Sequence, residues 1–76
     1  MKEILKKRFM DVIKRYLVAC VTGNIRDRNY YLGWLQGVTS ATFWIDDIEL
    51  YEYFNSEIER AIELSVVLIN EAYDKF

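Results

Sequence analysis

The first third of the chain carries apolar residues at the spacing of one helical face. Leu5, Phe9 and Tyr16 follow one another at steps of four and seven residues, which places their side chains on one side of an α-helix. Charged residues occupy the other sides, and Gly23 can adopt the left-handed conformation that commonly ends a helix. The pattern predicts a helix over about residues 2–22.

A second helix is predicted over about residues 26–44. Asn24 is the expected N-cap, because its side chain can accept a hydrogen bond from the backbone N–H of Asp27. An apolar stripe at helical spacing follows, and we expect it to face the core. Its members are Tyr31, Trp34, Leu35, Val38 and Ala41.

Gly33, Gly37 and Ala41 recur every four residues in this second helix and so share one face. Each glycine inside a helix costs about 1 kcal/mol relative to alanine, which calls for a compensating gain. Two roles stay open: a flat face that another helix of the bundle approaches closely, which we favour, or a face for self-association. Phosphate binding is disfavoured, because phosphate-binding glycines lie between a strand and a helix.

The third helix is predicted over about residues 46–75 and has a well-marked start. Asp46 is the expected N-cap, with Glu49 three residues later as in a capping box, and Ile45 and Leu50 are spaced for a hydrophobic staple. An apolar seam with alternating steps of three and four residues runs along the helix. Its members are Tyr51, Phe54, Ile58, Ala61, Ser65, Leu68 and Ala72.

One point of this helix leaves two alternatives. Ser56 and Glu59 repeat the S-x-x-E signature of a helix start, so the helix either continues through Asn55–Ser56 or kinks there. The seam keeps its phase across this point, which favours a continuous helix.

These elements predict an all-α fold, a three-helix up-down-up bundle with short turns. A chain of 76 residues is expected to form a single domain, residues 1–76. The third helix would be about 45 Å long and the first about 30 Å, so an apolar part of the third would overhang its neighbours. We therefore expect self-association, most simply as a homodimer.

The composition offers no familiar catalytic chemistry. The chain has no histidine and one cysteine, so we expect no metal site, no cofactor and no enzymatic activity. Cys20 falls on the apolar stripe of the first helix and is interpreted as a small core residue. Aromatic residues make up 16% of the chain. They suggest a protein interface, or tyrosines that reach water from the edge of the core.

The location expected from the sequence is the cytoplasm of a host cell. The start MKEILKKRF has no apolar stretch of the kind that a secretory signal requires. The longest apolar runs fall far short of the ~20 residues that span a membrane.

Charge divides the chain into two halves. Residues 1–28 carry eight Lys or Arg and three Asp or Glu, whereas residues 29–76 carry two and nine. One interpretation is pairing within the fold, with the basic start of the first helix beside the acidic start of the third, and with Arg26 and Arg28 beside Glu71 and Asp74. The other interpretation is that the charges serve partners.

The hypotheses about a partner differ in whether acidic or basic residues of this chain make the contact. An acidic strip of the third helix could dock on a basic groove of another protein; we expect partner contacts at Glu49, Tyr51, Glu52, Tyr53, Glu59 and Glu63. Basic residues of the first two helices could instead hold nucleic-acid phosphates; these are Lys6, Lys7, Lys14, Arg15, Arg26 and Arg28. The net charge of −2 argues against nucleic acid.

The stretch YYLGWLQGVTSATFWIDDIELYEYF resembles short helical accessory proteins of bacteriophages and related mobile elements. The resemblance implies a small protein that binds and blocks a host protein, such as a CRISPR effector or another defence enzyme. The leading hypothesis is therefore a non-enzymatic inhibitor or modulator of a larger host protein. The alternatives are a nucleic-acid-binding regulator and a structural homo-oligomeric phage component.

Overall fold

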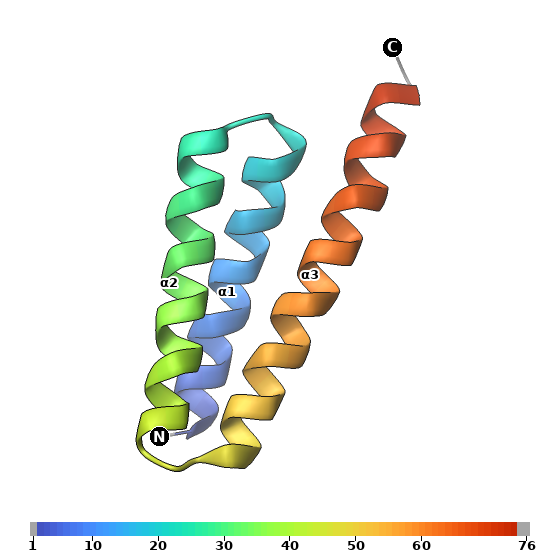
Figure 1. Cartoon of the computed structure of the whole chain (residues 1–76). Helices are drawn as coiled ribbons and strands as arrows, with labels where there is room; N and C mark the ends of the chain where they lie inside the picture. The colour runs from blue at the N-terminus through green and yellow to red at the C-terminus, as the bar shows by residue number, and fades with distance from the viewer. Residues whose placement is uncertain (1, 75–76) are drawn as a thin grey trace.

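The computed structural model describes residues 2–74 and confirms the all-α, three-helix up-down-up bundle (Figure 1). The helices are α1 (Lys2–Val21), α2 (Ile25–Trp44) and α3 (Ile48–Asp74), and each packs against the other two. Residue 75, the last residue of the predicted third helix, lies outside the described part of the chain. The molecule is elongated, with extents of 46 × 19 × 18 Å.

The core takes its largest buried side chains from all three helices. Phe9 of α1, Leu35 of α2 and Phe54 of α3 have no exposed surface. Phe9 and Phe54 stack with their ring centroids 4.1 Å apart, and Trp34 lies 6.4 Å from Phe9 on the α2 side. Such aromatic contacts stabilise a core beyond their burial alone. The centre of the bundle is therefore an aromatic cluster that spans α1, α2 and α3.

The connection between α1 and α2 follows the sequence prediction. Gly23 has a φ of 73°, and the backbone N–H groups of Gly23 and Asn24 donate to the carbonyl oxygens of Cys20 and Ala19. This pair of bonds is the Schellman arrangement at a helix end. Asn24 then caps α2, accepting from the Asp27 N–H at 3.1 Å.

The connection between α2 and α3 corrects the predicted cap. Asp46 has a φ of 59° and occupies the left-handed position after α2, where glycine is usual. The N-cap is Asp47, whose Oδ1 accepts from the Leu50 N–H at 3.2 Å. The predicted capping box with Glu49 and the staple between Ile45 and Leu50 are therefore wrong, because the helix begins one residue later than they require.

α3 is one continuous α-helix through residues 55–56, so the alternative of a break there is not realised. Figure 1 shows α3 leaning away from α1 and α2 toward its C-terminal end and reaching beyond the α1–α2 turn. A groove of about 420 Å³ opens at this end, where Cys20 and Gly23 face Ile69, Ala72 and Tyr73. The predicted overhang is therefore present, as the C-terminal end of α3 extends beyond the α1–α2 turn.

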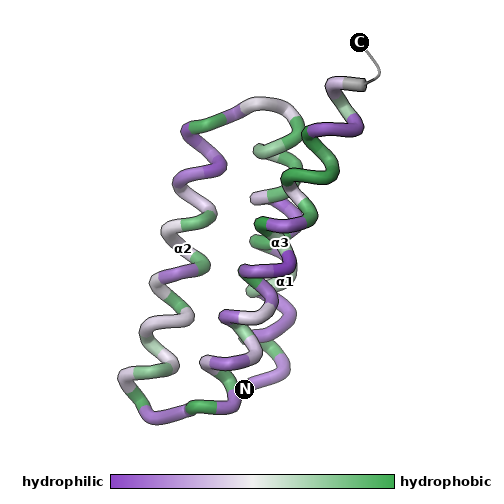
Figure 2. The backbone as a smooth tube through the Cα atoms, turned by 45° about the vertical axis from the view of Figure 1, so that its right-hand side comes forward, coloured by the Kyte–Doolittle hydropathy of each residue, from purple (hydrophilic) through white to green (hydrophobic). Residues whose placement is uncertain are grey.

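The orientation of α2 agrees with the prediction in part: Tyr31, Trp34, Leu35 and Val38 pack in or against the core, whereas Ala41 is exposed. Thr39 and Thr42 are buried together with Leu35, whereas Gly33, Gly37 and Ala41 are exposed on the outer side. Figure 2 shows α2 beginning in purple and continuing with many pale stretches, because glycine, serine, threonine, tyrosine and tryptophan have intermediate hydropathy. The favoured role of the glycines, close packing inside the bundle, is therefore wrong.

Candidate functional site

The acidic face of α3 consists of Glu49, Glu52, Glu59 and Glu63, all of which are exposed. The face exists because the buried seam of α3 occupies the opposite side of the helix. Glu52 and Glu59 are seven residues apart, and Glu63 follows one turn later. Side chains at this spacing point in similar directions. The structure thus brings the four predicted glutamates onto one side of α3.

The fold gives the four glutamates of the acidic face no ion-pair partner within residues 2–74, although Arg60 lines the same depression as Glu49 and Glu52. Within residues 2–74, a single ion pair joins different helical segments, between Lys2 Nζ and Asp47 Oδ2 at 3.0 Å. Arg60, the one basic residue of α3, lies 3.4 Å from Glu57 of the same helix. The expected pairing between the charged starts of the first and third helices is therefore limited to one contact. The four glutamates take part in none of these pairs.

The one interhelical ion pair shifts the pKa of both partners. The hydrogen bond and charge of Asp47 raise the pKa of the Lys2 ammonium. The hydrogen bond from Lys2 and the one from the Leu50 backbone lower the pKa of the Asp47 carboxyl. Asp47 therefore serves the fold, as an N-cap and as the partner of α1, and is not part of the acidic face.

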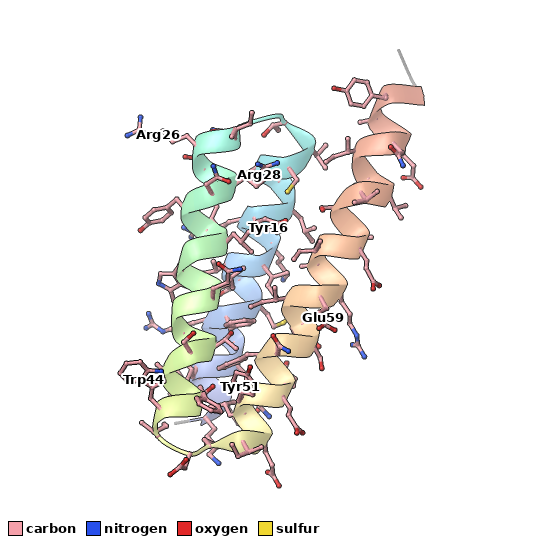
Figure 3. The ribbon with its side chains drawn as sticks, in the orientation of Figure 1. Tyr16, Arg26, Arg28, Trp44, Tyr51 and Glu59 are labelled. Carbon is pink, nitrogen blue, oxygen red and sulfur yellow. The ribbon has the colours of Figure 1, made fainter. Side chains whose placement is uncertain are left out.

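The two tyrosines predicted as partner contacts lie at different places. Tyr51 is half-buried, and its ring centroid is 5.4 Å from that of Phe43, so it packs between α3 and α2 (Figure 3). Tyr53 is also half-buried, with Lys6 Nζ 4.6 Å from its ring centroid. Tyr53 lines a shallow depression with Glu49, Glu52, Ser56, Glu57 and Arg60. Tyr53 therefore borders the acidic face, whereas Tyr51 lies outside it.

The six basic residues of the alternative hypothesis do not form one patch. Lys6 lies over Tyr53, and Arg28 is half-buried on the inner side of α2, near Tyr16. Figure 3 shows Arg26 projecting away from the bundle. Lys7 and Lys14 are exposed on α1.

Arg15 lines a groove between α1 and α2, and several of its neighbours there were not predicted. The groove has a volume of about 300 Å³, and its walls are Arg8, Asp11, Val12, Arg15, Tyr30, Tyr31 and Trp34. Arginines beside exposed aromatic rings can stack on bases and hold phosphates. The sequence signal for this groove is the pair Arg8 and Arg15, whose seven-residue spacing places both on one face of α1.

A second feature that the sequence analysis missed is an apolar corner where α2 meets α3. Phe43, Trp44, Ile45 and Ile48 are 56%, 83%, 72% and 48% exposed. Exposed apolar patches of this kind commonly mark interaction sites. The available signal was the run FWI directly before the two aspartates, which is too apolar for a turn at the surface.

The interior contains few titratable groups. Burial raises the pKa of the Tyr16 hydroxyl, and a hydrogen bond with the Cys20 thiol raises it further. Cys20 is buried, as predicted.

Within residues 2–74, no three His, Cys, Asp or Glu residues are grouped so that they could hold a metal ion. Among the same residues, no helix combines the length and apolar character that crossing a bilayer requires.

Comparisons with known proteins yield no match to a family model, to a curated protein or to a solved structure. The surfaces of the chain itself therefore carry the functional proposal.

Proposed function

We propose that the chain is a non-enzymatic protein-binding module that docks the acidic face of α3 on a basic surface of a larger protein. The observation that carries this proposal is that Glu49, Glu52, Glu59 and Glu63 are exposed and form no ion pair among the described residues. A row of like charges on one helix repels itself, so a basic partner would relieve that repulsion.

The electrostatics favour a fast and salt-sensitive encounter. Complementary charges steer association and raise its rate, and they have less effect on the final affinity. Affinity would come from less polar contacts at the edge of the face, and Tyr53 is placed there. Salt screens exposed charges over about 10 Å at 0.1 M, so the proposed complex weakens as the salt concentration rises.

The resemblance of residues 30–54 to phage accessory proteins suggests which kind of partner the chain would bind. On that resemblance the partner is a host protein, and the chain inhibits or modulates it. CRISPR effectors hold nucleic acid in a positively charged channel, and other nucleic-acid enzymes have comparable basic surfaces. An acidic helix could occupy such a surface in place of nucleic acid.

Affinity capture with two matched variants tests the proposal. Glu52→Gln with Glu59→Gln removes two exposed charges seven residues apart on α3, and Lys7→Gln with Lys14→Gln removes two at the same spacing on α1. Nuclease-treated bacterial lysate is passed over each bait, and the captured proteins are quantified by mass spectrometry. We expect the α3 variant to lose a basic protein that the wild type and the α1 variant retain. Equal recovery by both variants would contradict the proposal.

The groove between α1 and α2 supports a second candidate function, binding of single-stranded nucleic acid. Arg8 and Arg15 flank Tyr30, Tyr31 and Trp34 in this groove, and aromatic rings stack on bases without regard to sequence. A variant with Arg8→Gln and Arg15→Gln, compared with the α3 variant, separates this function from the first. Fluorescence anisotropy with a labelled oligonucleotide would show binding that falls steeply with salt and is weakened by Arg8→Gln with Arg15→Gln. The α3 variant would bind at least as well as the wild type.

A further inference from the structure

From Tyr30 to Trp44, the outer side of α2 is uncharged and carries an exposed aromatic residue at each end. Residues 29–45 contain no Asp, Glu, Lys or Arg. Tyr30 is 67% exposed and Trp44 is 83% exposed. A surface helix normally carries charged residues opposite the core, whereas interface centres are depleted of charge and enriched in tyrosine and tryptophan. The outer side of α2 therefore has the composition of an interface.

The surface between the two aromatic residues is flat. A Cβ added at Gly33 or Gly37 would meet nothing within 4 Å, so the backbone of α2 is accessible there. Ala41 continues the same face and is also exposed. Another helix can approach such a face closely, and side chains at its two ends can then reach across.

We propose that this face binds the same face of a second copy, with the two α2 helices antiparallel and crossing at Gly37. Tyr30 and Trp44 each lie seven residues from Gly37, and Gly33 and Ala41 each lie four residues from it. An antiparallel pair centred on Gly37 therefore places Tyr30 against Trp44 of the second copy and Gly33 against Ala41. Each contact occurs twice, as a two-fold interface requires.

Charge complementarity at the ends of the pair supports the antiparallel direction. Arg26 precedes Gly37 by eleven residues, or about 16 Å along the helix, and would lie level with the α2–α3 turn of the second copy. That turn carries Asp46, which is exposed. Within residues 2–74, neither Arg26 nor Asp46 takes part in an ion pair. A parallel pair would instead place the two copies of Arg26 side by side, which is unfavourable.

Figure 3 shows Arg26 and Trp44 at opposite ends of the same outer side of α2, both directed away from the bundle. The proposed partner residues are thus presented on one surface. This surface is separate from the acidic face of α3, so a homodimer formed in this way would present two acidic faces.

The available area is sufficient for a stable pair. A tyrosine or tryptophan buries about 150–250 Å², and the strip between Tyr30 and Trp44, about 21 Å long and 10 Å wide, adds about 200 Å² per copy. The two copies together would bury about 1,000–1,400 Å², above the ~1,000 Å² expected of a specific interface.

Sedimentation equilibrium of the full chain tests the pairing. The chain has a mass of 9.1 kDa, and we expect the wild type to approach twice that value as its concentration rises to about 1 mM. Gly37→Leu should raise the dissociation constant about tenfold or more, because two leucines would meet at the crossing point. The control Asn70→Leu introduces a leucine at an exposed site of α3, and it should leave the dissociation constant of the dimer unchanged.

The monomer should tolerate Gly37→Leu, since the site opens to solvent. Circular dichroism of the dilute variant checks that its helices remain. A wild type that keeps the mass of one chain throughout, or a folded Gly37→Leu variant that dimerises as well as the wild type, would overturn the proposal.

Disulfide cross-linking in a Cys20→Ala background tests the direction. Two helices whose axes lie 8–10 Å apart bring facing Cα atoms to about 3.4–5.4 Å, which includes distances that a disulfide spans. Oxidation of a mixture of Gly33→Cys and Ala41→Cys proteins should give cross-links between the two variants. Gly33→Cys alone should not cross-link, and efficient cross-linking of that variant would overturn the antiparallel arrangement.

Discussion

Phe9 of α1 and Phe54 of α3 stack with ring planes inclined by only 16°, and neither side chain has exposed surface. We expect Phe54→Ala to lower the free energy of unfolding by about 3–5 kcal/mol, because it removes buried area and leaves a cavity. Small domains are stable by only about 5–15 kcal/mol, so this variant should be close to unfolded. Urea denaturation followed by circular dichroism measures the change. Tyr73→Ala, at a site 75% exposed, is the control and should change the stability by about 0.5 kcal/mol or less.

Asp46→Gly should stabilise the chain. Asp46 has a φ of 59°, a conformation that costs L-residues up to about 1–2 kcal/mol and glycine nothing. A gain of about 1 kcal/mol would raise the melting temperature by about 4–8 °C for a domain of this size. Asp46→Asn removes the charge but tolerates the same conformation, and it should melt close to the wild type. A similar rise for the asparagine variant would show that charge, and not backbone conformation, is responsible.

The ion pair between Lys2 and Asp47 should make stability depend on pH. The folded-state pKa of Asp47 is lowered, so its contribution is present above the unfolded pKa and is lost as the pH falls through the folded pKa. The folded-state pKa of Lys2 is raised, so its contribution is present below the unfolded pKa and is lost as the pH rises through the folded pKa. The contribution is thus largest between about pH 5 and 9.

Asp47→Asn isolates this effect, because asparagine keeps a side-chain oxygen that can accept from the Leu50 N–H. Melting temperatures measured at low concentration from pH 2 to pH 8 should show the wild type above the variant near neutrality. The two curves should converge in acid. A constant difference across this range would contradict the assignment.

Gly33→Ala should stabilise the monomer by about 1 kcal/mol, through higher helix propensity and a less flexible unfolded chain. The added methyl group meets no other atom within 4 Å. Thermal melts at concentrations low enough to exclude self-association measure the effect. A loss of stability under these conditions would indicate that α2 is oriented as the sequence had suggested, with its glycines against a neighbouring helix.

The sequence was sufficient to predict the number of helices and their order, because α1 and α3 each carry a regular apolar seam. For α2 it placed Tyr31, Trp34, Leu35 and Val38 correctly toward the core, but it did not predict which of the small and polar residues are buried. Thr39 and Thr42 are buried because their hydroxyls donate to the carbonyl oxygens of Leu35 and Thr39 at 2.8 and 2.6 Å. With these groups satisfied within the helix, the cost of burying a threonine falls. A polar residue therefore faces the core while glycine and alanine face solvent, the reverse of the expected pattern.

The candidate site was likewise predicted in part from the sequence. The four glutamates of the acidic face could be grouped from helical periodicity alone. The position of Tyr51 could not, because its contact with Phe43 depends on how α2 and α3 meet. The predicted cap failed for a related reason. Asp46 and Asp47 are equally suitable caps by sequence, and only the backbone after α2 decides that Asp46 takes the left-handed position.

The lean of α3 away from its neighbours implies that this helix does not open as a unit. Phe54 has no exposed surface and Tyr73 is 75% exposed. Tertiary contacts therefore cover the part of α3 around Phe54 but leave its C-terminal turns largely exposed. Backbone amides should then exchange with solvent deuterium in a gradient, slowest around Phe54 and fastest in the last turns, where fraying requires little free energy. A binding partner that reached those last turns would reveal itself by slowing exchange there.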